Sequence, residues 1–248
     1  MTDRTTLEGR TALVTGASSG LGAHFARVLA AAGASVILAA RRRDALETLA
    51  AAVGDRASIV VLDVTDPASI ATATADLPPI DILVNNAGVV RDALALNQSE
   101  ADWDAVIDTN LRGVFQVAQA VARNMIAHGR GGAIVNIASI LGLRQGATVL
   151  PYAVSKAGVV QMTKVLALEW ARHGIRVNAL APGYFDTDLN REFWSTDAGK
   201  AMLKRIPQRR LGQLSDLDMP LLLLAGPGSA YMTGSILAVD GGHLVSTL

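Results

Sequence analysis

The feature that most constrains the fold is a regular alternation of short apolar runs with amphipathic segments. Apolar runs predict buried strands at Thr11–Thr15, Ser35–Ala40, Ser58–Leu62, Ile80–Val84, Ala133–Ala138 and Ile175–Leu180. Between the runs, apolar residues recur at helical spacing, with long helices expected around Trp103–Met125 and over Tyr152–Arg172. Strands that are apolar on both faces occur in parallel sheets covered by helices on both sides. The sequence therefore predicts an α/β fold with a doubly wound parallel sheet.

Local signals predict where several helices begin and end. Gly33 and Gly54 are expected to end the first two helices. Asp66 followed by Pro67 is typical of a helix start, and Asp44 is expected to cap the second helix in the same way. No repeat, low-complexity tract or flexible linker divides the chain, so we expect one domain over residues 1–248.

Residues 183–211 break the alternation directly after a predicted strand. This segment carries the aromatic residues Tyr184, Phe185, Phe193 and Trp194 together with several charges, without a clean period. Open α/β sheets bind ligands beyond the carboxyl ends of their strands. We therefore expect a substrate lid over 183–211.

Composition excludes several classes of function. The 22 Lys and Arg balance 22 Asp and Glu, and affinity for a phosphate backbone needs a surplus of cations, so no nucleic acid partner is expected. Cysteine is absent, and the four histidines show no ligand spacing, so we predict no metal site. The polar first ten residues do not form a signal peptide, and the apolar run Leu221–Ala225 is too short to cross a membrane. A cytoplasmic location without membrane contact is the expectation.

Gly16, Gly20 and Gly22 form a G-x-x-x-G-x-G loop between the first predicted strand and the first helix. Glycines there permit a tight turn, bring backbone N–H groups close to a pyrophosphate and let the helix pack on the sheet. An ordinary strand-to-helix turn is the alternative, because a glycine loop alone is weak evidence.

Tyr152 and Lys156 are four residues apart, so they share one face of a helix, with Cβ atoms about 5–6 Å apart. A free tyrosine has a pKa near 10, and bringing it close to neutrality requires about 4 kcal/mol of phenolate stabilisation. A nearby ammonium together with the positive ring of an oxidised nicotinamide is a source of such stabilisation. The spacing therefore predicts a tyrosine that works as an acid and base.

These residues occur in a pattern that resembles the short-chain dehydrogenase/reductase family over essentially the whole chain. The matching motifs are Thr15–Gly22, Asp63-Val64, Asn85–Gly88, Asn110, Ser139, Tyr152–Lys156, Asn178, Pro182-Gly183 and Thr187. Each piece alone is unspecific, but their joint order and spacing are very specific. The resemblance implies a single-domain, Rossmann-type, seven-stranded sheet whose last strand is around Ile236–Val239.

The resemblance implies a catalytic role for Asn110, Ser139, Tyr152 and Lys156. Hydride passes between a nicotinamide coenzyme and a carbonyl carbon while Tyr152 protonates the oxygen, and oxidation of an alcohol is the reverse. Ser139 would hydrogen-bond the same oxygen, and Lys156 would bind the nicotinamide ribose and lower the pKa of Tyr152. Asn110 would interrupt a helix and hold a water that joins Lys156 to solvent. Taken singly, Asn110 and Ser139 are also ordinary polar residues at a helix interior and a strand end.

The same resemblance implies a coenzyme site formed by residues from several strand ends. Those expected to contact the dinucleotide are Gly16, Ser18, Ser19, Gly20, Leu21, Gly22, Arg41, Arg42, Asp63, Val64, Asn86, Ala87, Gly88, Tyr152, Lys156, Pro182, Gly183 and Thr187. Asp63 and Val64 would hold the adenine, and Thr187 would bind the nicotinamide carboxamide. Asp63 has an ordinary alternative as a helix cap, and Asn85–Gly88 as a strand-ending turn.

Coenzyme choice is expected to depend on the end of the second strand. NAD-specific sites place an Asp or Glu there, which repels a ribose 2′-phosphate. Here the strand ends in Ala40, followed by Arg41 and Arg42. Arg41 is expected to bind the phosphate with help from Ser18, and Arg42 to stack on the adenine. The prediction is NADP(H) in preference to NAD(H); arginines that extend into water are the alternative.

The sequence thus predicts an NAD(P)-dependent ketone reductase or secondary-alcohol dehydrogenase. A catalytically silent dinucleotide sensor and a dehydratase or epimerase are the alternatives. The resemblance includes 3-oxoacyl reductases and sugar-alcohol dehydrogenases, and the substrate is left open because it depends on the variable segments Arg91–Leu96 and Leu141–Leu150 and on the lid. A small-molecule ketone or alcohol is the expected ligand. The same resemblance implies that the long helices pack against those of a second copy, so a homotetramer is the expected assembly, with a dimer as runner-up.

Overall fold

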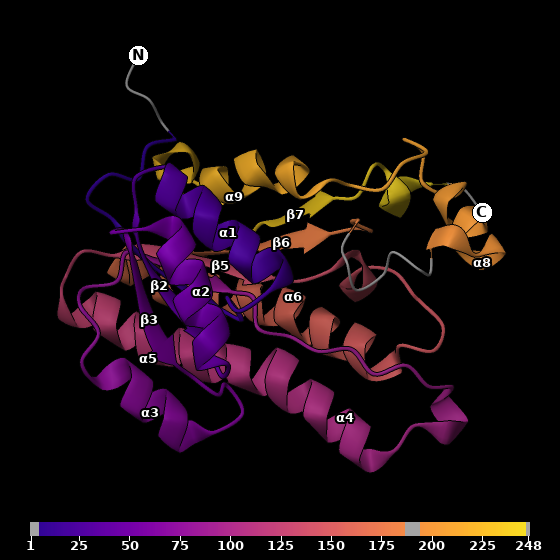
Figure 1. Cartoon of the computed structure of the whole chain (residues 1–248), viewed down its shortest axis with the longest axis horizontal. Helices are drawn as coiled ribbons and strands as arrows, with labels where there is room; N and C mark the ends of the chain where they lie inside the picture. Colours follow the sequence, from indigo (N-terminus) through magenta and orange to yellow (C-terminus); the bar gives the residue numbers. More distant parts are fainter. Residues whose placement is uncertain (1–4, 187–193, 247–248) are drawn as a thin grey trace.

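The computed structural model describes residues 5–186 and 194–246. They form a seven-stranded, all-parallel sheet in the order β3-β2-β1-β4-β5-β6-β7 (Figure 1). The strands are β1 (Thr11–Thr15), β2 (Ser35–Ala40), β3 (Ala57–Val61), β4 (Ile82–Asn85), β5 (Gly132–Ile137), β6 (Ile175–Pro182) and β7 (Ile236–Val239). The strand order reverses between β1 and β4, which is where open α/β sheets bind ligands. The predicted fold class, a Rossmann-type doubly wound sheet, is confirmed.

Helices cover both faces of the sheet (Figure 1). The main ones are α1 (Gly20–Ala31), α2 (Arg43–Val53), α3 (Pro67–Ala75), α4 (Glu100–Ile107), α5 (Gly113–Ala127), α6 (Leu150–Trp170), α8 (Asp197–Leu203) and α9 (Asp218–Ala225). One apolar core joins the sheet to α1, α2 and α9, and includes the fully buried Phe25 and Leu221. A second core on the other face joins it to α3, α5 and α6, and includes Val117 and Leu166.

Most helix signals in the sequence act as predicted. Asp66 caps α3 by accepting a hydrogen bond from the amide of Ala68, and Pro67 stands in its first turn. Gly54 follows α2 directly with a positive φ of 85°. The prediction that Asp44 caps α2 is wrong, because the helix begins one residue earlier at Arg43 and Asp44 lies inside its first turn. There its carboxylate still faces the positive end of the helix dipole.

Several other boundaries differ from the sequence-based prediction, most of them by one or two residues. β4 begins at Ile82 rather than Ile80, and the Ile80 amide donates to the Asn124 side chain at 3.0 Å. The long helix predicted around Trp103–Met125 is two α-helices, α4 and α5, joined by a π-helical turn over Asp108–Arg112. Single π-helical turns inside α-helices are frequent at functional sites, and this one contains Asn110.

A polar chain crosses the otherwise apolar centre of the sheet. Asn85 Nδ2 donates to Asn136 Oδ1 at 3.1 Å, and Asn136 Nδ2 donates to Thr163 Oγ1 at 2.9 Å. Thr163 in turn donates to the carbonyl of Val159 in α6. All three side chains are buried and hydrogen-bonded, so these polar contacts fix the positions of β4, β5 and α6 relative to one another.

We expect Asn136→Ala to lower the free energy of unfolding by about 1–3 kcal/mol, because Asn85 and Thr163 then lose buried partners. Urea denaturation measures this loss. Asn97→Ala, at an exposed position, is the matched control and should change the stability by less than about 0.5 kcal/mol. Equal stability of the two variants would contradict a structural role for the polar chain.

Candidate active site

The glycine loop between β1 and α1 is packed against the turn that follows β4. A Cβ at Gly22 would lie 2.3 Å from the Gly16 carbonyl oxygen, and one at Gly16 would lie 2.9 Å from the Ala87 Cα. Gly16 also has a φ of +66°, which favours glycine. Side chains at these two positions would push the loop off the sheet, so the close approach expected of a dinucleotide loop is present.

The start of α1 has the features of an anion site. Ser19 is the N-cap residue but makes no side-chain capping hydrogen bond, so the first amides of a 12-residue helix are left without that partner. A Cβ at Gly20 would meet no atom within 4 Å, so open space lies beside these amides. A pyrophosphate fits this arrangement of uncapped N–H groups and helix dipole.

The turn after β4 is held to the end of β1 by the Thr15 hydroxyl and the Asn86 side chain. Thr15 Oγ1 accepts hydrogen bonds from the amides of Asn86 at 3.0 Å and Ala87 at 3.1 Å. Asn86 Nδ2 donates back to the Thr15 carbonyl at 3.0 Å. Beyond them, a Cβ at Gly88 would lie 3.3 Å from Asn110 Oδ1 and 3.7 Å from Lys156 Nζ. This turn therefore joins the glycine loop to the predicted catalytic residues.

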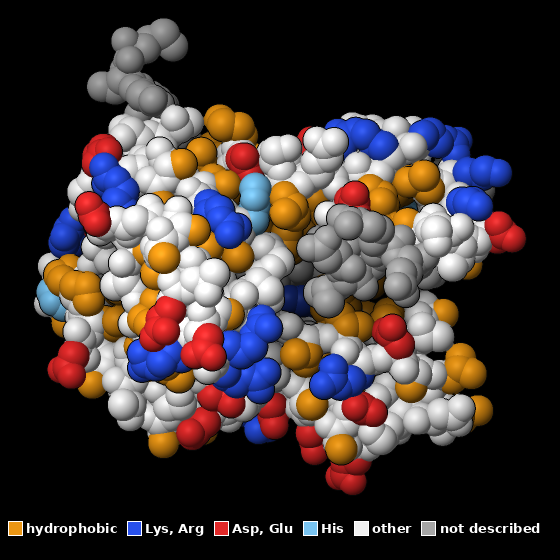
Figure 2. Space-filling view, viewed as in Figure 1, with side chains coloured by type: hydrophobic (Ala, Val, Ile, Leu, Met, Phe, Trp, Pro, Cys, Tyr) orange, Lys and Arg blue, Asp and Glu red, His pale blue; other side chains and the backbone are white. Residues whose placement is uncertain are grey.

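Two arginines follow β2 near the glycine loop, and basic side chains gather beside α2 in Figure 2. Arg42 Nη2 donates to the hydroxyls of Ser18 at 2.9 Å and Ser19 at 3.0 Å. The charge of Arg41 acts on Asp63 instead, and it lowers the pKa of that carboxyl group. Partial burial raises the pKa of Asp63, but hydrogen bonds from Thr65 and the Arg41 charge outweigh it and hold that pKa below its ordinary value. The arginine beside Ser18 is thus Arg42.

Asp63 occupies a turn at the end of β3 and does not cap α3. Its Oδ1 accepts from the amide of Thr65 at 2.9 Å and from the Thr65 hydroxyl at 2.7 Å. Val64, next to it, is buried beneath the same edge of the sheet. The helix-cap alternative for Asp63 is therefore excluded, since Asp66 performs that role.

Asn110 is fully buried in the π-helical turn between α4 and α5. Its Oδ1 accepts from the amide of Val89 at 2.8 Å, and its Nδ2 donates to the Val89 carbonyl at 2.9 Å. Nδ2 also lies 3.3 Å from the Ser155 hydroxyl, which donates to the Tyr152 carbonyl at 2.7 Å. Asn110 thereby links the strand-end turn to the first part of α6.

Tyr152 and Lys156 lie in α6 with the Lys156 Nζ 5.6 Å from the centre of the Tyr152 ring. Lys156 is only 4% exposed, and its Nζ donates to the carbonyl of Ile137 at 2.7 Å. Ser139 follows β5 and hydrogen-bonds the Tyr152 side chain. The structure therefore brings all four predicted catalytic residues to the carboxyl edge of the central strands.

Burial shifts the titration of both groups. It lowers the pKa of Lys156 to about 8. It raises the pKa of Tyr152, a rise that the Ser139 hydrogen bond opposes and Tyr184 increases. The described residues thus favour a neutral phenol, and Lys156 is not among the groups that shift the Tyr152 pKa, contrary to the expectation that it lowers this pKa. The positive charge of an oxidised nicotinamide would be the remaining contribution that favours the phenolate.

The predicted coenzyme residues after β6 are described in part. Pro182 ends β6, and a Cβ at Gly183 would lie 2.7 Å from the Asp240 Cα, so this position needs glycine. Thr187 lies outside the described residues, as do 188–193 of the predicted lid. The rest of that segment includes α8, and its Phe185 forms a bridge with Gly212, which lies just beyond the segment.

Sequence reasoning did not single out two residues at this edge, His243 and Arg144. His243 is buried with its ring 5.5 Å from that of Tyr184, and Arg144 binds its carbonyl. No sequence signal marks either residue, since one is a scattered histidine and the other stands in a variable loop. Over 5–186 and 194–246, no group of three acidic or histidine side chains is placed to hold a metal. Nor does that part of the chain contain a helix long and apolar enough to cross a membrane.

Comparison with known proteins places this geometry in a family. Residues 10–198 match the family model of the short chain dehydrogenase. The chain belongs to the short-chain dehydrogenase family. It is 42% identical over 245 residues to the 2-dehydro-3-deoxy-D-gluconate 5-dehydrogenase of Escherichia coli, with 96% of each chain covered. It is 40% identical over 246 residues to a 3-oxoacyl-[acyl-carrier-protein] reductase of Thermotoga maritima, covering 96% of this chain and 99% of the other.

The solved structures agree with this membership. A gluconate 5-dehydrogenase from Burkholderia cenocepacia, in complex with NADP and tartrate, matches with a TM-score of 0.94 and 42% identity, covering 99% of each chain. As a member of the short-chain dehydrogenase family, the protein is an NAD(P)-dependent oxidoreductase, and the predicted enzyme class is confirmed.

The depressed pKa of Lys156 predicts a pH dependence of stability. Between about pH 8 and the ordinary lysine value of 10.5, the unfolded chain carries a proton on Lys156 that the folded chain has lost. More protons bound in the unfolded state mean that stability rises with pH, here by up to about 1.4 kcal/mol per pH unit.

Urea denaturation of the coenzyme-free protein at pH 7.5–9.5 measures this slope. In Lys156→Met the rise should disappear, whereas Lys164→Met, at an exposed position of α6, should keep it. The same slope in wild type and Lys156→Met would show that Lys156 does not titrate in this range.

Proposed function

We propose that this protein interconverts a ketone and a secondary alcohol with NADP(H), using Tyr152 as acid and base. The observation that carries the proposal is the placement of Ser139, Tyr152 and Lys156 together, next to Gly88 of the coenzyme turn. When bound, the coenzyme supplies or accepts the hydride at its nicotinamide ring. The Tyr152 hydroxyl gives its proton to the carbonyl oxygen in reduction and takes it back in oxidation.

The other residues of the site have supporting roles in this proposal. The Ser139 hydroxyl hydrogen-bonds the same substrate oxygen and orients it toward Tyr152. Lys156 keeps its ammonium near the phenol, where it stabilises the phenolate formed when the proton leaves. Asn110 lies in the π-helical turn between α4 and α5 and fixes the start of α6 through its hydrogen bond to Ser155. A silent dinucleotide sensor has no need of a buried lysine that costs stability at neutral pH, so catalysis is favoured over that alternative.

The coenzyme is proposed to lie across the carboxyl edge of the sheet. Its pyrophosphate contacts the loop Gly16–Gly22 with Ser18, Ser19 and Leu21, and its adenine lies between Asp63-Val64 and the arginines. The adenosine ribose lies beside Asn86–Gly88. The nicotinamide half contacts Tyr152, Lys156, Pro182, Gly183 and Thr187. The segment 183–211 is proposed as the lid over this half of the coenzyme. The cytoplasmic location of the protein remains a prediction.

A homotetramer is proposed for the assembly. Helix α6 exposes Val154, Val165 and Leu168 to 41%, 43% and 82%, and α5 exposes Phe115 to 39%. Apolar residues so exposed on two neighbouring long helices suit a surface that is covered by a second copy. Light scattering at micromolar concentration tests this, because a single species at the 25.8 kDa subunit mass would contradict it.

Tyr152→Phe removes the proposed proton donor and keeps the ring. We expect kcat to fall by about 10²–10⁴-fold, the usual contribution of a general acid or base. Nicotinamide absorbance with a panel of ketones and alcohols measures turnover, and coenzyme fluorescence measures binding, which should persist. Turnover near that of the wild type would rule out the mechanism.

Coenzyme choice is tested by separating the two arginines. The contacts with Ser18 and Ser19 favour Arg42 as the ligand of a 2′-phosphate, with Arg41 beside Asp63. Arg42→Ala should lower kcat/KM with NADP(H) by about 10- to 150-fold per charge-assisted hydrogen bond lost, and leave that with NAD(H) nearly unchanged.

Arg43→Ala is the matched control, because Arg43 pairs with Glu47 within α2. It should not change the ratio of kcat/KM for the two coenzymes. A native preference for NAD(H), or equal effects of Arg42→Ala with both coenzymes, would show that this arginine does not face the ribose.

A further inference from the structure

An aromatic cluster borders the proposed reaction centre on the β6–β7 side. The Tyr184 ring lies 5.4 Å from that of Trp194 and 5.5 Å from that of His243. Tyr184 follows Gly183 directly and acts electrostatically on Tyr152, whose pKa it raises. Tyr184 thereby links this aromatic cluster to the proposed proton donor.

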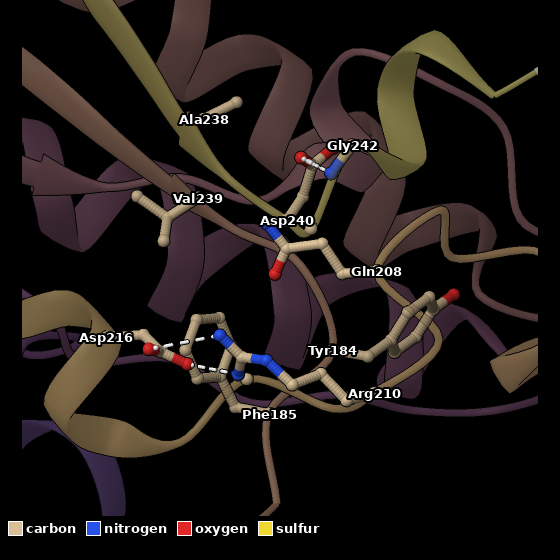
Figure 3. A pocket seen from close by; sticks show the side chains of 11 residues that line it. Tyr184, Phe185, Gln208, Arg210, Asp216, Ala238, Val239, Asp240 and Gly242 are labelled. Atoms are coloured by element: carbon tan, nitrogen blue, oxygen red, sulfur yellow. Dashed lines mark hydrogen bonds and ion pairs between the residues drawn. The ribbon is translucent and has the colours of Figure 1, made fainter.

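A cavity of about 370 Å³ opens beside Tyr184 (Figure 3). Its charged wall residues are already occupied. Arg210 points to Asp216 and forms a two-pronged ion pair with its carboxylate, at 2.6 Å and 3.3 Å. Asp240 accepts hydrogen bonds from the amides of Gly242 at 2.9 Å and Leu244 at 2.7 Å. The ion pair of Arg210 with Asp216 and the backbone hydrogen bonds of Asp240 therefore leave none of these three side chains available to bind a charged ligand.

Arg144 differs from these groups because it has no counter-ion in the described part of the chain. It stands in the loop after Ser139, half-buried, and its Nη1 donates to the His243 carbonyl and lies 3.4 Å from the Ser246 hydroxyl. Over residues 5–186 and 194–246, no carboxylate pairs with it, and its Nε and Nη2 atoms make no hydrogen bond. A half-buried guanidinium held in place with donors to spare is suited to an anion.

His243 supplies a second, independent sign of an incomplete site. It is only 4% exposed, and its Nδ1 is buried without a hydrogen-bond partner in the described residues. Burial lowers the pKa of His243, Arg144 and Arg205 lower it further, and only Asp240 opposes them. The surroundings of this ring thus carry an excess of positive charge and an unsatisfied nitrogen.

We propose that Arg144 binds the carboxylate of a hydroxy acid or keto acid whose reacting carbon lies at Tyr152. The inference rests on the proposed function and narrows its substrate to a polyhydroxy acid. Arg144 is fixed through the backbone of His243, so little of its freedom is lost on binding. A neutral ketone or a 3-oxoacyl thioester offers no carboxylate at this position and would not depend on Arg144.

The test compares gluconate with sorbitol, which has a hydroxymethyl group in place of the carboxylate. In Arg144→Met, kcat/KM for gluconate should fall by about 10- to 150-fold, while that for sorbitol stays within a factor of about 2. Arg144→Lys should recover part of the preference, because it keeps the charge. Arg27→Met, at an exposed position of α1, is the matched control, since it also removes an arginine, and should behave as wild type.

Tartrate binding to the protein–NADP complex, measured by calorimetry, gives a readout that needs no turnover. Its Kd should rise by a similar factor in Arg144→Met and not in Arg27→Met. Unchanged tartrate affinity in Arg144→Met, or equal losses with gluconate and sorbitol, would overturn the role of Arg144. Absence of turnover with every alcohol and ketone would instead defeat the proposed function, while a tartrate site that depends on Arg144 would still stand.

Discussion

The hydroxyl of Thr15 joins the two strands between which the order of the sheet reverses. By accepting from the amides of Asn86 and Ala87, it fixes the turn after β4 against the end of β1. The glycine loop packs on one side of this turn, and Asn110 and Lys156 lie on the other, beyond Gly88. The glycine loop and the proposed catalytic residues therefore share one support, so their relative position does not depend on the surface loops.

The burial of Lys156 links the stability of the fold to the catalytic role proposed for this residue. An ammonium in this position is disfavoured by desolvation, which is why its pKa falls to about 8, and a single carbonyl hydrogen bond from Ile137 does not compensate. The fold tolerates this cost because the two large apolar cores on either side of the sheet stabilise the chain as a whole. A charge held this close to a phenol, in a site shielded from water, is worth more than the same charge at the surface.

Three of the arginines at the carboxyl edge differ in the partners of their guanidinium groups. Arg42 is held by the two serines of the glycine loop, Arg210 is neutralised by Asp216, and Arg144 has no counter-ion in the described part of the chain. A guanidinium already paired with a carboxylate binds a second anion weakly. Of these three arginines, Arg42 and Arg144 are therefore the ones available to an anion, and they stand at the two ends of the site. One end suits a 2′-phosphate and the other a substrate carboxylate.

The sequence by itself determined the fold class and most of the candidate site. Strand periodicity, the position of the glycine loop between a strand and a helix, the four-residue step from Tyr152 to Lys156 and the helix signal Asp66-Pro67 are local patterns, which can be recognised from neighbouring residues alone. The tertiary structure decided what depends on distant partners. It replaced one long helix by α4, a π-helical turn and α5, and moved the cap of α2 from Asp44 to Arg42. It also set Arg42 against Ser18 and brought His243 to Tyr184 and Arg144. These last contacts join segments 24 to 99 residues apart, and no sequence period reports them, because side-chain direction and burial are settled only when the chain has packed.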